Sequence, residues 1–491
     1  MGSDQQADRR SPDSWDTRLI IDGERVAGDG PTIVVDDPAT EQAIAHVRGA
    51  SAEQVEAAVT SSAKALAGSN WRKDPERRKK VLLRFADLIE ENRSNLESTL
   101  VQEVGTPVVL CGPIHLGASI EMIRHFAELA TIDRTRDFGR DTRAPESASI
   151  VRYEAAGVVA GIGAYNYPLV FLASKAAAAL AAGCSIVYMP SPQTPLATLM
   201  CGQLALEAGV PAGILNMIVG DAEAARALTL HEDVARVSFT GSIDVGRKVM
   251  EQAAQGLKGV VLELGGKSPG IVLPGADPGE VAMPLHGRYL RNAGQGCQSP
   301  TRLLIPEEMF DDFVDASRDA YAQIKVGDPW DQTTVAGPLI SAAHRQTVEG
   351  YVERAVAGGG EVLVGGGRPE ELDRGWYMNS TLVGRVGNRS EISREELFGP
   401  VASLMTYKSI DELVELSNDS VYGLAASIFG PIDLAKDVAT RLQAGTVYIN
   451  GGGQLRVDTV LAAWKMSGVG AEWGEDGLRE FLEPQHIQWA V

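Results

Sequence analysis

The fold of this chain is decided by residues 236–250, which read RVSFTGSIDVGRKVM. Residues 236–239 form a short run that is rich in strand-forming side chains, and this run predicts a strand. Thr240-Gly241-Ser242 then forms a turn, in which Ser242 stands where a serine caps a helix that begins near Val245. A strand that passes directly into a helix is the unit from which parallel α/β sheets are built.

The same unit recurs on both sides of this stretch. Further strands are expected at residues 158–162, 185–189, 215–219 and 260–264. Helices are expected at residues 169–182, 196–208, 222–230 and 245–255. The short connections favour a parallel, doubly wound sheet with right-handed crossovers, an architecture that binds dinucleotides at the C-terminal ends of its strands.

Upstream, the pattern is helical. Ser51 opens a capping-box pattern, and the helix after it carries periodic apolar positions through residues 55–66. A long amphipathic helix is expected over residues 77–104, closed by Gly105. The chain has 491 residues, enough for roughly three compact units at about 150 residues each.

Composition and charge exclude several classes of protein. Hydrophobic residues make up 44% and charged residues 22%, the balance of a globular protein and not of a disordered one. Lys and Arg number 45 against 65 Asp and Glu, which gives a formal net charge of -20. Such a surface repels phosphate backbones and anionic lipids, and no basic block offsets it. We therefore expect neither a nucleic-acid nor a membrane partner and favour a small-molecule enzyme.

The cysteines and histidines indicate a reducing compartment. Cys111, Cys184, Cys201 and Cys297 are too few and too irregularly spaced for a disulfide framework. The seven histidines form no HExxH motif or His/Cys cluster, so no metal is expected. Residues 1–19 lack the apolar stretch of a signal peptide, and a cytoplasmic location is expected.

One uncharged run, residues 155–174, is long enough to cross a bilayer. It contains three glycines, Asn166 and Pro168, and a further uncharged stretch follows Lys175. A strand, a turn and a buried helix of an α/β core explain this run better than a membrane span does.

Two familiar phosphate-binding signatures are missing. No GxGxxG follows an expected strand, and Gly266-Lys267-Ser268 lacks the first glycine of a Walker loop because Val261 stands there. The remaining candidate is the turn at Gly241 and Ser242, whose backbone N–H groups could hold a pyrophosphate. A capped turn is as common without a ligand, so both interpretations stay open.

Cys297 is the candidate nucleophile. It ends the small, glycine-flanked loop NAGQGC, residues 292–297. Cys184 and Cys201 lie in apolar surroundings, where a cysteine is usually an inert core residue. A cysteine nucleophile also needs a donor for the oxyanion and a base.

Residues 261–269 (VLELGGKSP), followed by residues 292–297, closely resemble the paired signatures of the aldehyde dehydrogenase superfamily. Further matches follow in family order along nearly the whole chain: DPAT (37–40), NYP (166–168), QTP (193–195), FTGS (239–242), EELFGP (395–400) and KMSG (465–468). Ordered agreement of several motifs is much harder to obtain by chance than agreement of one. The resemblance implies an α/β fold with a parallel, doubly wound cofactor domain, an α/β catalytic domain and a small oligomerisation arm.

The resemblance implies a non-acylating, NAD(P)-dependent oxidation of an aldehyde to a carboxylic acid. Cys297 would attack the carbonyl carbon, and the Asn166 amide with the Cys297 N–H would stabilise the oxyanion. Hydride transfer would leave a thioester, and Glu263 would activate the water that hydrolyses it. Lys175 and Glu472 match positions that support proton movement. Taken singly, Asn166 could be a turn residue and Glu263 a solvated carboxylate.

The resemblance also assigns residues to the cofactor: Gly241, Ser242, Glu396, Phe398, Met189 and Leu264. Of these, Glu396 and Phe398 match the positions that hold the nicotinamide ribose and ring. The family usually has Lys-Pro-x-Glu after the strand that ends at Met189, whereas this chain has MPSP at residues 189–192. The missing glutamate would repel a 2′-phosphate and the missing lysine would attract one. We expect NAD as the cofactor, and NADP stays open.

Tyr165, Tyr167 and Phe171 are expected to line the substrate mouth. Their rings favour an apolar or aromatic aldehyde over a short dicarboxylic semialdehyde. Alternatively, these rings only pack in the core, and Arg291, close to Cys297 in the sequence, could accept an anionic group.

By the same resemblance, residues 17–137 and 156–264 form the cofactor-binding domain and residues 265–445 the catalytic domain that carries Cys297. Residues 138–155 and 476–491 form an arm that joins subunits into a homodimer or homotetramer. Two other functions stay open. In an acylating relative, coenzyme A would replace water as the acceptor, although Glu263 argues against it. A binding or structural homologue would have little reason to retain Cys297, Asn166 and Glu263 together.

Overall fold

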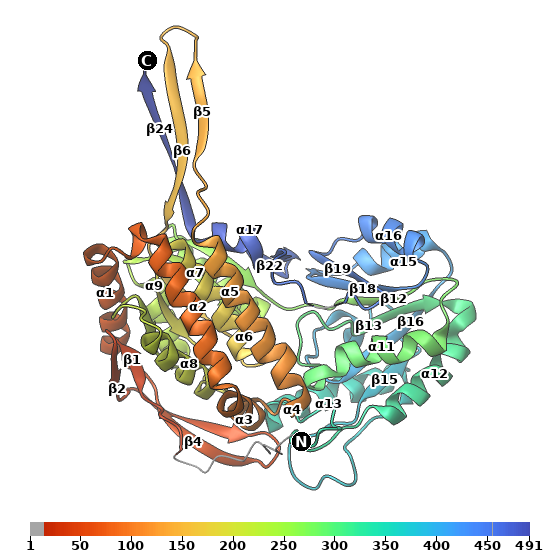
Figure 1. Ribbon diagram of the computed structural model, residues 1–491. Coiled ribbons are helices and arrows are strands. Elements are labelled where there is room, and N and C mark those ends of the chain that lie inside the picture. Colours follow the sequence, from red (N-terminus) through yellow and green to blue (C-terminus); the bar gives the residue numbers. More distant parts are fainter. Residues whose placement is uncertain (1–13, 454) are drawn as a thin grey trace, which may run out of the picture.

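The computed structural model, which describes residues 14–453 and 455–491, has two α/β lobes and a narrow arm that projects from the first lobe (Figure 1). The sheet of the first lobe has the order β2 (Glu24–Val26), β1 (Leu19–Ile21), β9 (Leu215–Met217), β8 (Ser185–Met189), β7 (Val158–Ile162), β10 (Val234–Thr240), β11 (Gly259–Glu263), β22 (Gly468–Val469). The sheet of the second lobe has the order β14 (Glu361–Val364), β15 (Thr381–Gly384), β16 (Val401–Tyr407), β13 (Arg302–Pro306), β12 (Pro269–Val272), β18 (Ala425–Phe429), β19 (Thr446–Ile449).

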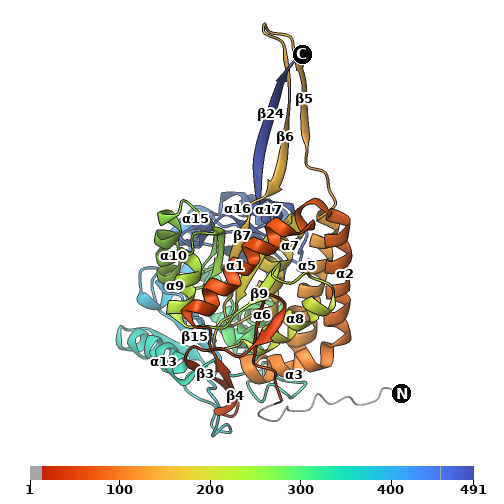
Figure 2. The ribbon, with the colours of Figure 1, turned by 90° about the vertical axis from the view of Figure 1, so that its left-hand side faces the viewer.

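The middle of the first sheet confirms the predicted parallel, doubly wound arrangement. Strands β9, β8, β7, β10 and β11 pair in parallel, while the edge strands β1, β2 and β22 pair antiparallel. One face is covered by α6 (Pro168–Leu172), α7 (Ala178–Ala182) and α8 (Leu196–Glu207), with α2 (Pro75–Glu91) and α5 (Ala118–Leu129) outside them. The other face is covered by α1 (Ala52–Gly68), α9 (Ala222–Leu230) and α10 (Ile243–Gln255) (Figure 2). Helices on both faces explain why β7 and β8 are buried throughout.

The helix caps were predicted well, but two helices differ from expectation. Ser51 and Gln54 form the capping box of α1, and the Val245 N–H donates to Ser242 Oγ at the start of α10. Residues 77–104 form two helices, α2 and α3 (Arg93–Val104), because Asn92 leaves helical geometry and its Nδ2 donates to the carbonyl of Leu88. Between α6 and α7, residues 173–177 form a π-helical segment instead of a continuous α-helix.

The second lobe carries α11 (Pro278–Leu290), α12 (Phe310–Gln323), α13 (Ala342–Ala357), α14 (Glu391–Arg394), α15 (Ile410–Asn418) and α16 (Ile432–Arg441) around its sheet. Short pairings complete the chain: β3 (Thr32–Asp37) with β4 (Gln42–Arg48), β17 (Tyr422–Gly423) with β21 (Trp464–Lys465), and β20 (Leu461–Ala462) with β23 (Ala471–Glu472), which precedes α17 (Gly474–Arg479). Three apolar clusters fill the second lobe, and one large cluster fills the first.

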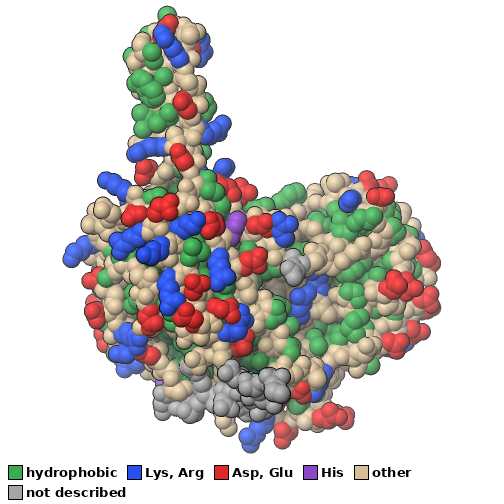
Figure 3. Space-filling model, viewed as in Figure 1, with side chains coloured by type: hydrophobic (Ala, Val, Ile, Leu, Met, Phe, Trp, Pro, Cys, Tyr) green, Lys and Arg blue, Asp and Glu red, His purple; other side chains and the backbone are tan. Residues whose placement is uncertain are grey.

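The arm is an antiparallel sheet of three strands, in the order β24 (Leu482–Ala490), β6 (Ser147–Ala155), β5 (Arg136–Asp141). Strand β24 pairs with the whole of β6, so the end of the chain lies beside a segment more than 300 residues earlier in the sequence. Apolar side chains gather along the arm (Figure 3), and Phe138, Ile487, Trp489 and Val491 are exposed.

The uncharged run at residues 155–174 lies within the first lobe, where it covers the end of β6, all of β7 and all of α6. Over residues 14–453 and 455–491, we find no helix that combines the length and the apolar character needed to span a bilayer.

Candidate active site

The chain passes from the first sheet to the second at residues 264–268, between the end of β11 at Glu263 and the start of β12 at Pro269. Cys297 lies in the loop after the short helix η4 (Arg291–Gly294), and Asn166 lies between β7 and α6. The surface is hollowed between the two lobes (Figure 3).

Two glycines allow this crossing segment to approach its neighbours closely. A Cβ on Gly265 would lie 2.1 Å from Glu396 Oε2, and a Cβ on Gly266 would lie 2.3 Å from the carbonyl oxygen of Cys297. The Gly266 N–H donates to Glu396 Oε1 at 2.9 Å. The backbone after Glu263 is therefore packed directly against both Glu396 and the Cys297 loop, and any larger residue would push them apart.

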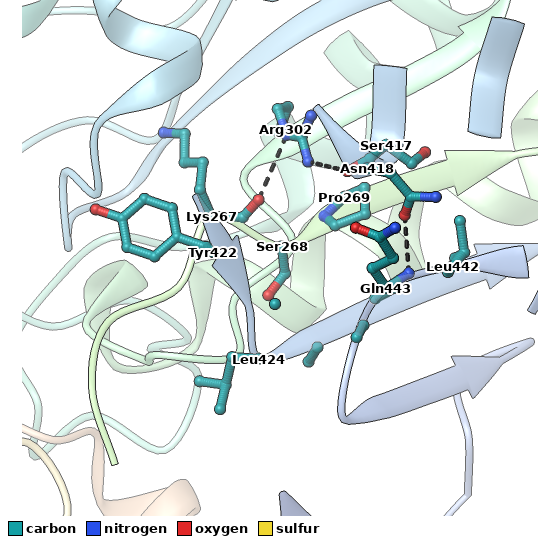
Figure 4. Close-up of a pocket in the computed structure, with 14 residues that line it drawn as sticks. Lys267, Ser268, Pro269, Arg302, Ser417, Asn418, Tyr422, Leu424, Leu442 and Gln443 are labelled. Carbon is teal, nitrogen blue, oxygen red and sulfur yellow. Dashed lines mark hydrogen bonds between the residues drawn. The ribbon is translucent and has the colours of Figure 1, made fainter. Parts of the chain in front are cut away.

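The buried Arg302 side chain fixes the end of the same segment (Figure 4). Its guanidinium donates to the carbonyls of Lys267, Leu416 and Ser417 at 3.4, 2.6 and 2.7 Å. The Lys267 ammonium is buried without a hydrogen-bond partner among the described residues, and burial, followed by the neighbouring Arg302, lowers its pKa to about 7. Arg302 thus ties the crossing segment to the end of α15.

The Asn166 amide is buried and faces the Cys297 loop. Its Nδ2 donates to the carbonyl of Gln295 at 2.8 Å. This bond uses one of the two N–H groups, and no described residue accepts from the other. Gln295 is itself held by Tyr165, whose hydroxyl donates to Gln295 Oε1, and by the N–H of Ile340.

Three predicted residues, Lys175, Glu263 and Glu472, form a buried charged cluster at the end of β11. Lys175 Nζ forms an ion pair with Glu472 Oε1 at 2.5 Å and donates to Ser238 Oγ at 3.2 Å. Glu263 is buried, and its Oε1 has no partner among the described residues. Burial raises the pKa of Glu263, the neighbouring Glu472 raises it further, and Lys175 opposes both. The Glu263 carboxyl group therefore keeps its proton at pH values above those at which a glutamate ordinarily loses it.

Cys297 is partly exposed, and the burial of the rest of the residue raises the pKa of its thiol to about 12. Glu396 and, to a smaller extent, Glu263 raise the Cys297 pKa further, because a thiolate beside negatively charged carboxylates is disfavoured. The other three cysteines are fully buried in the first lobe. Cys297 is therefore the cysteine that a ligand between the lobes can reach, and it needs a base to become a nucleophile.

The residues predicted for the cofactor divide into two groups. Gly241 and Ser242 lie at the start of α10, and Phe398 packs edge-on against Tyr165 with ring centroids 5.8 Å apart. Burial raises the pKa of Glu396 to about 7. The side chains of Met189 and Leu264, by contrast, belong to the apolar core. At these two positions the backbone alone can face a ligand.

The aromatic residues predicted for the substrate also differ in placement. Tyr165 bonds Gln295 and contacts Phe398. Tyr167 packs against His115 with ring centroids 5.0 Å apart, and both Arg291 and Cys297 lie close enough to perturb the pKa of its hydroxyl. Phe171 is buried in α6. The Tyr167 hydroxyl oxygen lies 3.6 Å from the position that a Cβ on Gly296, the residue before Cys297, would take.

Sequence reasoning missed three residues, Arg288, Tyr448 and Gln298, that contact one another in the order given and end next to Cys297 in the sequence. The Arg288 guanidinium lies 3.8 Å from the centroid of the Tyr448 ring, and the Tyr448 hydroxyl donates to Gln298 Oε1 at 3.0 Å. Gln298 could have been noticed because it follows Cys297 directly. Tyr448 gave no signal, since it lies in β19, far along the chain.

A dinucleotide-type sheet whose strand ends face a cysteine loop, an amide and buried carboxylates defines a two-lobed α/β oxidoreductase. The sequence model of the aldehyde dehydrogenase family matches residues 26–487. The chain therefore belongs to the aldehyde dehydrogenase family, and both the predicted fold class and the predicted enzyme class are confirmed.

Solved structures of this family have the same fold. Betaine aldehyde dehydrogenase from Staphylococcus aureus, in complex with NAD+, is 34% identical with a TM-score of 0.93, covering 97% of this chain and 95% of that one. A mutant of aldehyde dehydrogenase C from Pseudomonas syringae, in complex with NAD+ and octanal, is 34% identical with a TM-score of 0.92 over 98% of each chain. An NAD+ complex of aldehyde dehydrogenase from Bacillus cereus is 33% identical with a TM-score of 0.93 over 97% of each chain.

Proposed function

We propose that this chain oxidises an aldehyde to the carboxylic acid through a thioester on Cys297, with NAD+ as the hydride acceptor. The observation that carries the proposal is the Asn166 amide, which is anchored to the Gln295 carbonyl through one N–H and has no acceptor for the other. This second N–H and the Cys297 N–H are the donors that an oxyanion on the Cys297 adduct needs, each worth about 3 kcal/mol in the transition state.

The covalent step starts when the Cys297 thiol passes its proton to a water molecule and its Sγ attacks the carbonyl carbon. A C–S bond forms, and the carbonyl electrons move to the oxygen, where the Asn166 amide stabilises the negative charge. The carbonyl then re-forms as the C–H bond breaks, and the hydrogen leaves with its electron pair. NAD+, when bound, supplies a nicotinamide ring that takes up this hydride. The aldehyde carbon is thereby oxidised and stays on Cys297 as a thioester.

Hydrolysis of the thioester falls to Glu263. Its carboxylate takes a proton from water while the water oxygen attacks the thioester carbon. The C–S bond breaks, the carboxylic acid leaves, and the Cys297 thiolate is protonated again. The buried pair of Lys175 and Glu472, which perturbs the pKa of Glu263, gives the proton a route away from the site.

The strand ends fit a dinucleotide. Thr240 Oγ1 and Glu263 Oε1 are buried without partners among the described residues, and such atoms need a ligand or water. The N-terminus of α10, at Gly241 and Ser242, favours the negative charge of a pyrophosphate. The NAD+ bound in the structural neighbours favours NAD for this chain. NADP is the alternative, because residues 189–192 carry no charged group that discriminates between the two.

For the substrate, we propose an apolar or aromatic aldehyde. Tyr167 lies beside Cys297, and the Pseudomonas syringae neighbour holds octanal. Arg291 favours a second candidate, an aldehyde with an anionic group, because its guanidinium lies near Tyr167 and has no ion-pair partner among the described residues. Steady-state kcat/KM values for hexanal, benzaldehyde, succinic semialdehyde and betaine aldehyde distinguish them. A preference for succinic semialdehyde that Arg291→Gln abolishes would select the second candidate.

We also propose the division of the chain into a cofactor-binding domain (17–137 and 156–264), a catalytic domain (265–445) and an arm (138–155 and 476–491) that joins subunits. A lone three-stranded sheet with exposed apolar side chains is poorly stable in water, so a second copy of the chain is its expected cover. Light scattering should give the mass of a dimer or tetramer.

The experiment that tests the reaction compares wild type with Cys297→Ser, using NAD+ reduction as the readout and Cys201→Ser as the matched control. We expect Cys297→Ser to lose more than about a thousandfold in kcat while the control stays active. A strict need for coenzyme A would indicate an acylating enzyme instead. NAD+ binding without turnover of any aldehyde by the wild type would indicate a binding homologue.

A further inference from the structure

A buried polar group lies behind the Cys297 loop and takes no part in the chemistry proposed above. Thr106 follows the glycine that ends α3, His115 lies in the π-helical segment Cys111–Gly117, and Asn292 lies in η4. Their exposed fractions are 0%, 0% and 2%. At such burial, polar atoms need partners inside the protein. Within this group, His115 Nδ1 is the side-chain atom that has none among the described residues.

Only one assignment of donors and acceptors fits the hydrogen bonds of this group. Thr106 Oγ1 donates to Asn292 Oδ1 at 2.8 Å, and an amide oxygen can only accept. The single hydroxyl proton of Thr106 is therefore used, and the 3.3 Å contact between Thr106 Oγ1 and His115 Nε2 must be a bond that the ring N–H donates. Burial lowers the pKa of His115 to about 3, so the ring stays neutral.

The same series of hydrogen bonds continues to Asn166, the proposed donor to the oxyanion. Asn292 Nδ2 donates to the backbone carbonyl of Asn166 at 3.1 Å. The carbonyl of Asn292 accepts from both the backbone N–H and the Nε2 of Gln295, each at 3.1 Å. The carbonyl of Gln295 in turn accepts from Asn166 Nδ2. Asn292 therefore holds Asn166 directly at its backbone and, through Gln295, at its side chain.

The backbone of η4 depends on these bonds. Asn292 (φ 52, ψ 36) and Ala293 (φ 54, ψ 34) are two consecutive non-glycine residues in the left-handed region. Asn enters this region more readily than most residues, but Ala does so only where its surroundings impose it. The two bonds of the Asn292 amide, one from Thr106 and one to Asn166, fix the side chain at the start of this left-handed pair.

We propose that Thr106, directed by His115, is a positioning residue that sets the orientation of the Asn292 amide and, through it, of the Asn166 amide. Without the Thr106 hydroxyl, Asn292 Oδ1 would be buried without a donor. The amide could then turn over, which would bring its oxygen against the Asn166 carbonyl. This inference rests on the proposed function, because it concerns the donor to the oxyanion.

The test is Thr106→Val, which keeps the shape of the side chain and removes the donor. We expect kcat for aldehydes to fall about tenfold, because a misoriented Asn166 amide stabilises the oxyanion less, although it is still present. KM for NAD+ should not change. Alkylation of Cys297 by iodoacetamide in the cofactor-free protein should stay within about twofold of wild type, because alkylation forms no oxyanion. Thr106→Ser, which restores the donor, should recover most of kcat.

Thr198→Val is the matched control, since Thr198 is equally buried but its Oγ1 has no partner among the described residues. It should keep the wild-type kcat. If Thr106→Val fails to fold, Asn292→Gly replaces it, because glycine tolerates the left-handed backbone and removes both side-chain bonds. An unchanged kcat in Thr106→Val, no rescue by Thr106→Ser, or an equal loss of kcat and alkylation rate would overturn the inference. Inactivity of the wild type would instead overturn the proposed function.

Discussion

Glu103 and Glu263 are both buried carboxyl groups of the first lobe, but they differ in their hydrogen-bond partners. Both oxygens of Glu103 accept backbone N–H groups from the start of α8, those of Leu196 and Ala197, at 2.7 and 2.9 Å. Glu263 Oε1 has no partner among the described residues. Glu103 replaces a missing helix cap, whereas Glu263 is left with an oxygen that must be satisfied by something else.

Burial alone therefore does not mark a functional carboxylate. It raises the pKa of both groups, that of Glu103 to about 8. The difference lies in the partners: Glu103 has its own backbone donors, while Glu263 faces Glu472 and Lys175 and borders the Cys297 loop. From this contrast we expect changes at Glu103 to affect stability and changes at Glu263 to affect turnover.

The largest expected effect is that of Glu263→Gln. Loss of the general base should lower kcat by about 10²–10⁴-fold. The melting temperature should not fall, because the change removes a buried carboxyl group beside Glu472. Glu103→Gln, assayed as folded protein, should keep most of its activity. If the two variants lose similar amounts of kcat, the contrast between these carboxyl groups is wrong.

Asn166→Ala should have the next largest effect. Removal of one oxyanion donor should lower kcat by about 10²–10³-fold. Asn216 offers a control, because its buried amide donates to the carbonyl of Ala58 and so supports the fold. Asn216→Ala should lower the melting temperature without a comparable loss of kcat. Wild-type turnover in Asn166→Ala would remove the amide from the mechanism.

Glu396→Gln should make Cys297 easier to ionise. Glu396 is the carboxyl group that raises the Cys297 pKa most, after burial itself. A lower Cys297 pKa increases the thiolate fraction at pH 8, so alkylation by iodoacetamide should be severalfold faster than in wild type. Glu395→Gln changes a neighbouring exposed carboxylate and should leave the rate unaltered. Identical pH profiles for wild type and Glu396→Gln would contradict this prediction.

The smallest expected effect is the contribution of Glu103 to the pH dependence of stability. Its folded pKa of about 8 lies above its ordinary value of 4.5. Between these values the folded protein binds more protons than the unfolded chain, so stability falls as pH rises, by at most about 1.4 kcal/mol per pH unit. The melting temperature of wild type should drop more steeply from pH 5 to pH 8 than that of Glu103→Gln. Parallel curves would show that Glu103 does not contribute.

Local signals in the sequence were enough for the parallel middle strands of the first sheet, but not for β1, β2 and β22. Strands β7 and β8 and the caps at Ser51 and Ser242 follow from short runs of β-branched residues and from capping side chains. The break at Asn92 was not predictable in the same way. The apolar periodicity continues through it, and the interruption depends on one side-chain bond to the Leu88 carbonyl.

The support of the candidate site could not be predicted for a different reason. Thr106 and Asn292 are 186 residues apart, and the Asn292 amide meets Asn166 across 126 residues. No local pattern predicts these pairings, because a sequence motif marks single segments and does not show which distant side chain each segment meets in the fold. Cys297, Asn166 and Glu263 were found through the family motifs that contain them.

The proposed mechanism requires an acyl group on Cys297, and mass spectrometry of the digested protein can detect this group. Glu263→Gln should be mixed with NAD+ and hexanal and quenched in acid, which preserves thioesters. We predict that the peptide containing Cys297 gains the mass of a hexanoyl group, that hydroxylamine removes it, and that the peptides of Cys111, Cys184 and Cys201 stay unmodified. An unmodified Cys297 peptide after a measured burst of NAD+ reduction would contradict the account.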